Sequence, residues 1–123
     1  AHVETAAGMV LSDDYIRAVA NATHEVGGLF VLDCIASGAL WVDMAELGVD
    51  VLLSAPQKGW SGWPGAGYVM LGEAARAAVR STSSTSFAAD LGKWLTETQR
   101  NYHGRFGGSC DDGSRLLAGE QSR

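Results

Sequence analysis

Apolar residues fall into short blocks along this chain, and polar or glycine-rich segments separate the blocks. Residues 29–32 and 49–53 are continuous apolar runs of the kind that a parallel strand buried on both faces needs, and residues 68–71 form a third run. The segment after Ser12 repeats its apolar residues close to every 3.6 positions and predicts a helix capped by that serine. Residues 73–80 are rich in alanine and predict another helix. Strands and helices in alternation indicate an α/β fold with a mostly parallel sheet and flanking helices.

The composition and charge of the chain limit the kinds of binding partner and cellular compartment that we expect. The chain has 123 residues, 46% of them hydrophobic and 19% charged, which is ordinary for one small globular domain. Its formal charge of -5 argues against nucleic acid and anionic membrane surfaces as partners, and no apolar run is long enough to cross a membrane. The two cysteines, Cys34 and Cys110, are far apart and predict neither a disulfide framework nor a metal site. We therefore expect a reducing, cytoplasmic setting.

Two of the expected strands are followed by residues that carry chemistry. Asp33 follows residues 29–32, and Lys58 lies shortly after residues 49–53. Ligands of open α/β sheets bind beyond the carboxyl ends of the strands, so we expect this carboxylate and this amine to open on the same edge. Pyridoxal 5'-phosphate (PLP) requires that combination, because an acid keeps its ring nitrogen protonated and an amine forms an imine with its aldehyde.

Each residue also has an ordinary interpretation. An aspartate at the end of a buried strand is common in α/β folds, and a lysine just past a strand is usually a solvated surface residue. Cys34 is typical of a small buried hydrophobe, and Trp60 of a packing residue. The residues alone therefore establish an α/β domain with a candidate site at Asp33 and Lys58.

Three blocks in a fixed order make the assignment more specific. The segment Leu-Asp-Cys-Ile-Ala-Ser-Gly (residues 32–38) is followed by Ser-Ala-Pro-Gln-Lys-Gly (residues 54–59), and His-Val-Glu-Thr-Ala-Ala-Gly-Met (residues 2–9) precedes both. Together they resemble the core of the class V aminotransferases, closest to the alanine–glyoxylate and serine–glyoxylate aminotransferase group. The resemblance extends from His2 to about Trp94. It implies part of the large domain of a PLP-dependent transferase of fold type I.

The resemblance also implies roles for residues around the cofactor. Lys58 corresponds to the Schiff-base lysine, which is also the base that moves the proton between substrate and cofactor. Asp33 corresponds to the partner of the pyridinium nitrogen, and Ile35 to the residue that presses on one face of the ring.

Three further positions contact the cofactor if the resemblance holds. Thr5 corresponds to a hydrogen-bonding residue near the phenolic oxygen of the ring. Gln57 corresponds to a phosphate ligand, with Ser54 nearby. Ordinary packing or capping at the ends of strands is the competing interpretation for Ser54, Gln57 and Ile35.

The domain organisation departs from the family. The family's upstream phosphate loop and its C-terminal small domain have no counterpart here, and Tyr102-His103 is followed by Arg105 where the family has threonine. We expect residues 1–95 to be the PLP-binding core of the large domain and residues 96–123 to be a divergent, irregular tail. A truncated or frame-shifted product of a longer gene would have this pattern, so we expect little or no activity from the chain alone.

The implied reaction is amino transfer from a small amino acid such as alanine or serine to a 2-oxo acid such as glyoxylate, in a parent enzyme that is a homodimer. Two alternatives remain open. Cysteine desulfurases and kynureninases share the aspartate and lysine, and a desulfurase also needs a mobile cysteine, for which Cys110 is the candidate. The other alternative is a non-catalytic remnant domain.

Overall fold

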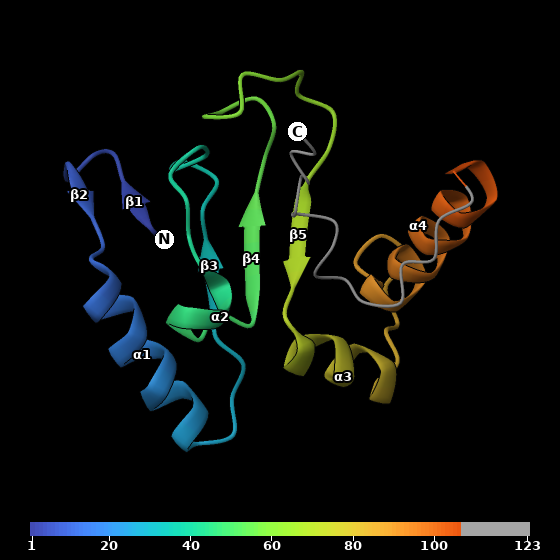
Figure 1. Cartoon of the computed structure of the whole chain (residues 1–123), viewed down its shortest axis with the longest axis horizontal. Coiled ribbons are helices and arrows are strands. Elements are labelled where there is room, and N and C mark those ends of the chain that lie inside the picture. Colours follow the sequence, from blue (N-terminus) through green and yellow to red (C-terminus); the bar gives the residue numbers. More distant parts are fainter. Residues whose placement is uncertain (107–123) are drawn as a thin grey trace, which may run out of the picture. The chain divides into compact units, whose positions relative to one another are not determined.

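The computed structural model describes residues 1–106, with side chains as far as residue 100. The chain divides into two compact units, residues 1–78 and the residues from 79 onward. Helix α3 (Glu73–Ser81) crosses this division, and helix α4 (Leu91–Phe106) belongs to the second unit. The other elements of the first unit are, in chain order, β1 (Val3–Glu4), β2 (Met9–Val10), α1 (Asp13–Glu25), β3 (Val31–Asp33), α2 (Met44–Leu47), β4 (Val51–Ser54) and β5 (Tyr68–Leu71) (Figure 1).

The main sheet has three strands in the order β3-β4-β5. Strands β3 and β4 are parallel, and the register places Asp33 beside Leu53. Strand β5 is antiparallel to β4 and places Tyr68 beside Ser54. The α/β fold predicted from the sequence is confirmed, with one parallel and one antiparallel pair among the described strands.

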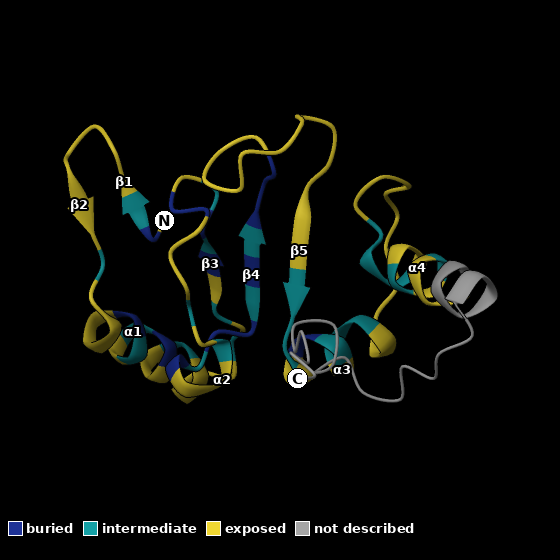
Figure 2. Ribbon diagram, turned by 45° about the horizontal axis from the view of Figure 1, so that its top comes forward, coloured by how far each residue is buried: buried dark blue, intermediate teal, exposed yellow. Residues whose placement is uncertain are grey.

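One face of this sheet forms the core with the helices. Ile16 of α1 and Leu47 of α2 are buried against Leu32 of β3 and Leu52 of β4. Alternate residues of a strand point to opposite faces, so the neighbouring strand positions lie on the other side of the sheet. There Val31 remains 50% exposed, and the burial pattern therefore covers one face of the sheet only (Figure 2).

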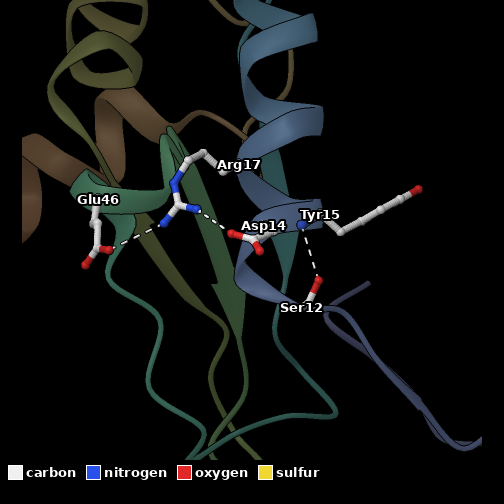
Figure 3. A network of polar contacts seen from close by, with 5 residues as sticks. All are labelled: Ser12, Asp14, Tyr15, Arg17 and Glu46. Atoms are coloured by element: carbon white, nitrogen blue, oxygen red, sulfur yellow. Dashed lines mark hydrogen bonds and ion pairs between the residues drawn. The ribbon is translucent and has the colours of Figure 1, made fainter.

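Local signals fix the ends of both core helices. Ser12 accepts a hydrogen bond from the Tyr15 amide and caps α1, and Asp43 caps α2 in the same way. On the surface, the Arg17 guanidinium contacts Asp14 within α1 and Glu46 of α2 (Figure 3). These ion pairs are solvent-exposed, so they contribute little to stability.

A buried carboxylate joins the amino ends of β3 and β4. Asp50 lies just before β4 and is 8% exposed. Its Oδ2 accepts a hydrogen bond of 2.7 Å from the Phe30 amide and lies 2.7 Å from Nε2 of His24 at the end of α1. The carboxylate therefore ties α1 to the edge of the sheet where both strands begin.

In the second unit, α4 begins after Asp90, which accepts a hydrogen bond from the Lys93 amide. The helix continues through Phe106, so the first part of the expected irregular segment 96–123 is helical. Residues 107–123 lie outside the described part of the chain, and the predicted boundary at residue 95 stays a prediction. No helix within the described residues has the length and apolar character needed to cross a membrane.

Candidate functional site

The carboxyl ends of β3 and β4 lie side by side at one edge of the sheet. The Cys34 amide donates a hydrogen bond of 2.8 Å to the Leu53 carbonyl, which extends the parallel ladder beyond Asp33. Parallel strands present their carboxyl ends to the same side, so the loop after Asp33 and the loop that carries Lys58 leave from one edge (Figure 1). Ligands of α/β proteins bind at this kind of edge.

The backbone that follows Asp33 fixes one oxygen of its carboxylate. Oδ1 accepts a hydrogen bond of 2.9 Å from the Ile35 amide, so the side chain turns back over its own loop. No hydrogen bond or ion pair reaches Oδ2 from the rest of residues 1–100. The half-buried carboxylate is therefore held in orientation and keeps one acceptor oxygen for another group.

The backbone around Lys58 is held on both sides. Pro56 accepts a hydrogen bond of 2.8 Å from the Gly62 amide, and the Lys58 carbonyl accepts one of 3.1 Å from the Ser61 amide. The Lys58 side chain itself is exposed. Its amine makes no ion pair or hydrogen bond with the other side chains that the structure describes. A tight loop thus presents an unpaired amine.

The two loops touch through glycine backbones. A Cβ added to Gly59 would lie 2.7 Å from the Cα of Gly38 and 2.7 Å from the Ala39 nitrogen. A Cβ on Gly38 would overlap the Cα of Gly59, and Gly38 also has φ of 47°, which favours glycine. The residue directly after Lys58 therefore packs on the loop that begins at Asp33.

Ser54 has partners inside the protein. Its hydroxyl is 3.4 Å from the Cys34 carbonyl, to which it donates, and it accepts a hydrogen bond of 2.8 Å from the Trp60 indole. The Trp60 ring also meets Tyr68 edge-on, with centroids 6.3 Å apart. Ser54 is buried, whereas Gln57 lies exposed in the lysine loop. The packing interpretation of Trp60 and the internal role of Ser54 fit together.

Thr5 lies apart from these two loops, in the exposed turn between β1 and β2. The backbone ties this hairpin to the same edge, because the His2 amide donates a hydrogen bond of 2.7 Å to the Asp33 carbonyl. The hairpin turn lies at the end of the sheet where β3 and β4 finish (Figures 1 and 2). Ile35 is half-buried directly beyond Asp33.

The burial of Cys34 agrees with the small buried hydrophobe expected from the sequence, whereas the glycine contact at this edge was not assigned from it. The Cys34 thiol is buried, and this burial raises its pKa, so it is a poor nucleophile at neutral pH. The mutual contact of Gly38 and Gly59 depends on the pairing of β3 with β4, and glycine in the sequence only hints at a close approach.

Several expected residues lie beyond the described side chains. Tyr102, His103 and Arg105 fall within α4, where the backbone alone is described, and Cys110 lies outside the described residues. The desulfurase interpretation, which needs Cys110, therefore gains no support from the site.

Known proteins resemble this chain over most of its length. No family model matches it. The 42 kDa subunit of a soluble hydrogenase from Anabaena cylindrica is 31% identical over 101 residues, which are 81% of this chain and 26% of that protein. The 2-aminoethylphosphonate–pyruvate transaminase of Burkholderia mallei is 36% identical over 106 residues, 85% of this chain and 28% of that protein. An alanine–glyoxylate aminotransferase from a Nostoc species superimposes with a TM-score of 0.63 and 24% identity over 78% of this chain and 25% of that chain.

The chain thus spans about a quarter of the length of the curated relatives that it matches. The structural match shows that the chain adopts part of an aminotransferase fold over 78% of its length. The resemblance expected from the three sequence blocks is confirmed.

Proposed function

We propose that this chain carries the part of a class V aminotransferase that binds PLP, since it is similar to about a quarter of the length of such enzymes. The observation that carries this proposal is the shared edge of β3 and β4. There a carboxylate with a spare oxygen and an unpaired lysine leave from neighbouring loops that touch at Gly38 and Gly59. The donor set fits PLP, which needs an anion for its ring nitrogen and an amine for its aldehyde.

Asp33 holds the ring in this proposal. Its Oδ1 is engaged with the Ile35 amide, so its carboxylate would hold the ring through the remaining oxygen. A carboxylate at this position keeps that nitrogen protonated, because the nearby negative charge favours the charged form of the base. PLP bound there supplies an aldehyde that accepts the amino group and a ring that withdraws electrons from the substrate carbon.

Lys58 binds the cofactor and then moves the proton. The tight loop fixes its backbone and leaves its long side chain free to move. Such a lysine would hold the cofactor through its amine and would act as the general base for the substrate. We assign Ile35 to one face of the ring, Thr5 to its phenolic oxygen and Gln57 to the phosphate.

The substrates are proposed from the relatives. The names of two aminotransferases similar to this chain specify 2-aminoethylphosphonate with pyruvate and alanine with glyoxylate. We therefore propose amino transfer from a small amino acid such as alanine or serine to a 2-oxo acid such as glyoxylate. The parent enzyme is proposed to be a cytoplasmic homodimer, and the 123-residue chain alone to have little or no turnover.

A PLP titration of the purified chain tests the proposal. An imine absorbance band in the visible should appear in the wild type and in Lys93→Ala, and it should be lost in Lys58→Ala. Lys93 is the other lysine of the chain and is the matched control. Asp33→Asn keeps an oxygen for the Ile35 amide but loses the charge, so PLP affinity should fall by roughly 10- to 100-fold. An equally strong band in Lys58→Ala would exclude Lys58 as the cofactor lysine.

A further inference from the structure

We propose that the contact between Gly38 and Gly59 is the device that positions Lys58 toward Asp33, so that PLP reacts with Lys58 in preference to the chain's other lysine. The proposal rests on the proposed function, since it concerns the same site. It assigns a positioning role to two residues that themselves contact no reacting atom.

The first step is that Lys58 has little freedom in its backbone. The hydrogen bonds from Gly62 to Pro56 and from Ser61 to Lys58 close the loop that carries it. The loop therefore moves as a unit, and any displacement of Gly59 is passed to the adjacent Lys58.

The second step is that the opposite loop is also fixed. The Cys34 carbonyl accepts hydrogen bonds from the Gly38 amide at 3.0 Å and from the Ser37 hydroxyl at 3.2 Å. Asp33 begins this loop and is tied to it through the Ile35 amide. A fixed loop on the acid side and a closed loop on the amine side thus meet at one backbone contact.

The third step is that this contact has no space for a side chain. A Cβ on Gly59 lies 2.7 Å from backbone atoms of the Gly38 loop, and ordinary contact begins at 3.4 Å. Both partners are backbone atoms, which cannot rotate away as a side chain would. An alanine at residue 59 must therefore push the loops apart by about 0.7 Å, and a misplacement of about 1 Å can cost about 100-fold in a reaction that depends on position.

The chain offers an internal measure of selectivity, because its only lysines are Lys58 and Lys93. Lys93 lies in the second unit, over the Phe87 ring at 3.6 Å, and reports the reaction of PLP with an ordinary surface amine. The purified chain is incubated with PLP and reduced with borohydride. Peptide mass spectrometry then gives the ratio of pyridoxyl label on Lys58 to label on Lys93.

We expect a ratio well above one in the wild type and at least a roughly 10-fold lower ratio in Gly59→Ala. Gly65→Ala is the matched control, because a Cβ on Gly65 meets no atom within 4 Å, and its ratio should equal that of the wild type. Total label and circular dichroism are measured in parallel. A general loss of folding changes the dichroism spectrum, whereas misplacement of Lys58 lowers the ratio and the total label while the spectrum stays that of the wild type.

The outcomes separate the two proposals. A wild-type ratio of Lys58 label to Lys93 label near one would contradict the proposed PLP site, and the positioning role would fail with it. A high ratio that stays within twofold in Gly59→Ala, or that falls equally in Gly65→Ala, would overturn the positioning role alone.

If Gly59→Ala lacks the wild-type dichroism spectrum, Ser37→Ala is used in its place, because this substitution loosens the Gly38 loop without adding an atom. Its ratio should fall severalfold, and an unchanged ratio would again overturn the proposal.

Discussion

Replacing Asp50 with alanine should destabilise the first unit more than any surface carboxylate does. Asp50 is 8% exposed, and its Oδ2 has two partners at 2.7 Å, the Phe30 amide and the His24 ring. A hydrogen bond to a charged acceptor contributes about 1.5–3 kcal/mol, and a partly exposed pair such as that with His24 contributes up to about 1 kcal/mol. The loss in the free energy of unfolding should therefore be about 3 kcal/mol.

Urea denaturation followed by circular dichroism at neutral pH measures this loss. For a small protein the slope is about 1–3 kcal/mol per molar urea, so the midpoint should fall by about 1.5 M. Asp50→Asn should cost less, because its amide oxygen can still accept from Phe30. His24→Ala removes only the ring contact and should cost about 1 kcal/mol.

Asp14 is the matched control. It is also a carboxylate beside a basic side chain, at 3.0 Å from Arg17, but its side chain is 96% exposed (Figure 3). Asp14→Ala should therefore cost less than about 1 kcal/mol. Equal losses in Asp50→Ala and Asp14→Ala would refute the reasoning that burial and the Phe30 amide give Asp50 its effect.

Three further predictions concern the other edge of the sheet. Ser54→Ala removes the hydrogen-bond acceptor of the Trp60 indole, so it should lower the free energy of unfolding by about 1–2 kcal/mol and shift the tryptophan emission. Ser83→Ala, in a loop of the second unit, is the control and should change neither quantity. In a Cys110→Ser background, the buried Cys34 thiol should react with a disulfide reagent only as fast as the chain unfolds, and a rapid reaction in the folded chain would contradict its burial. Burial raises the pKa of the Cys34 thiol, so above the ordinary value of about 8.5 this thiol loses its proton first in the unfolded state. The free energy of unfolding should therefore fall as the pH becomes alkaline. The fall should be larger in the Cys110→Ser background than after the additional change Cys34→Ala.

The sequence predicts the elements well where local signals agree. The cap at Ser12 and the apolar period after it place α1 correctly, and the run at residues 68–71 matches β5. The other two strands are shifted. The run at 29–32 is observed as Val31–Asp33, because the Phe30 amide bonds to the Asp50 side chain before the ladder with β4 begins.

The hairpin of β1 and β2 was not expected from the small and mixed residues of the N-terminal segment. Each of its strands has only two residues, which is too short for a period to show. The segment is placed by a single long-range bond, from the His2 amide to the Asp33 carbonyl. A backbone hydrogen bond of this kind cannot be recognised from the pattern of apolar and polar side chains along the sequence.

The candidate site shows the same division between local and distant information. Asp33 and Lys58 were identified because both follow apolar runs, and the parallel register supports the shared edge that this pattern predicts. The contact between Gly38 and Gly59 joins loops that are separated by a helix and a strand, so it depends on how those elements pack. The sequence shows where the strands lie along the chain, whereas the distance between the loops that follow them depends on the fold.

Two aspartates at opposite ends of the same strand pair illustrate why sequence alone cannot rank such residues. Asp33 and Asp50 both border apolar runs, and both carboxylates bond to a backbone amide. Asp50 also has the His24 ring, so the Oδ2 that bonds to the Phe30 amide has a second partner within the fold. Asp33 has one hydrogen-bond partner within residues 1–100 and lies at the edge where α/β proteins bind ligands. The other oxygen of its carboxylate is not one of the fully buried, unpartnered side-chain atoms of the described residues, so a group from outside can reach it. The number of partners within the fold, together with the edge of the sheet on which each carboxylate lies, supports a stabilising role for Asp50 and the proposed binding role for Asp33.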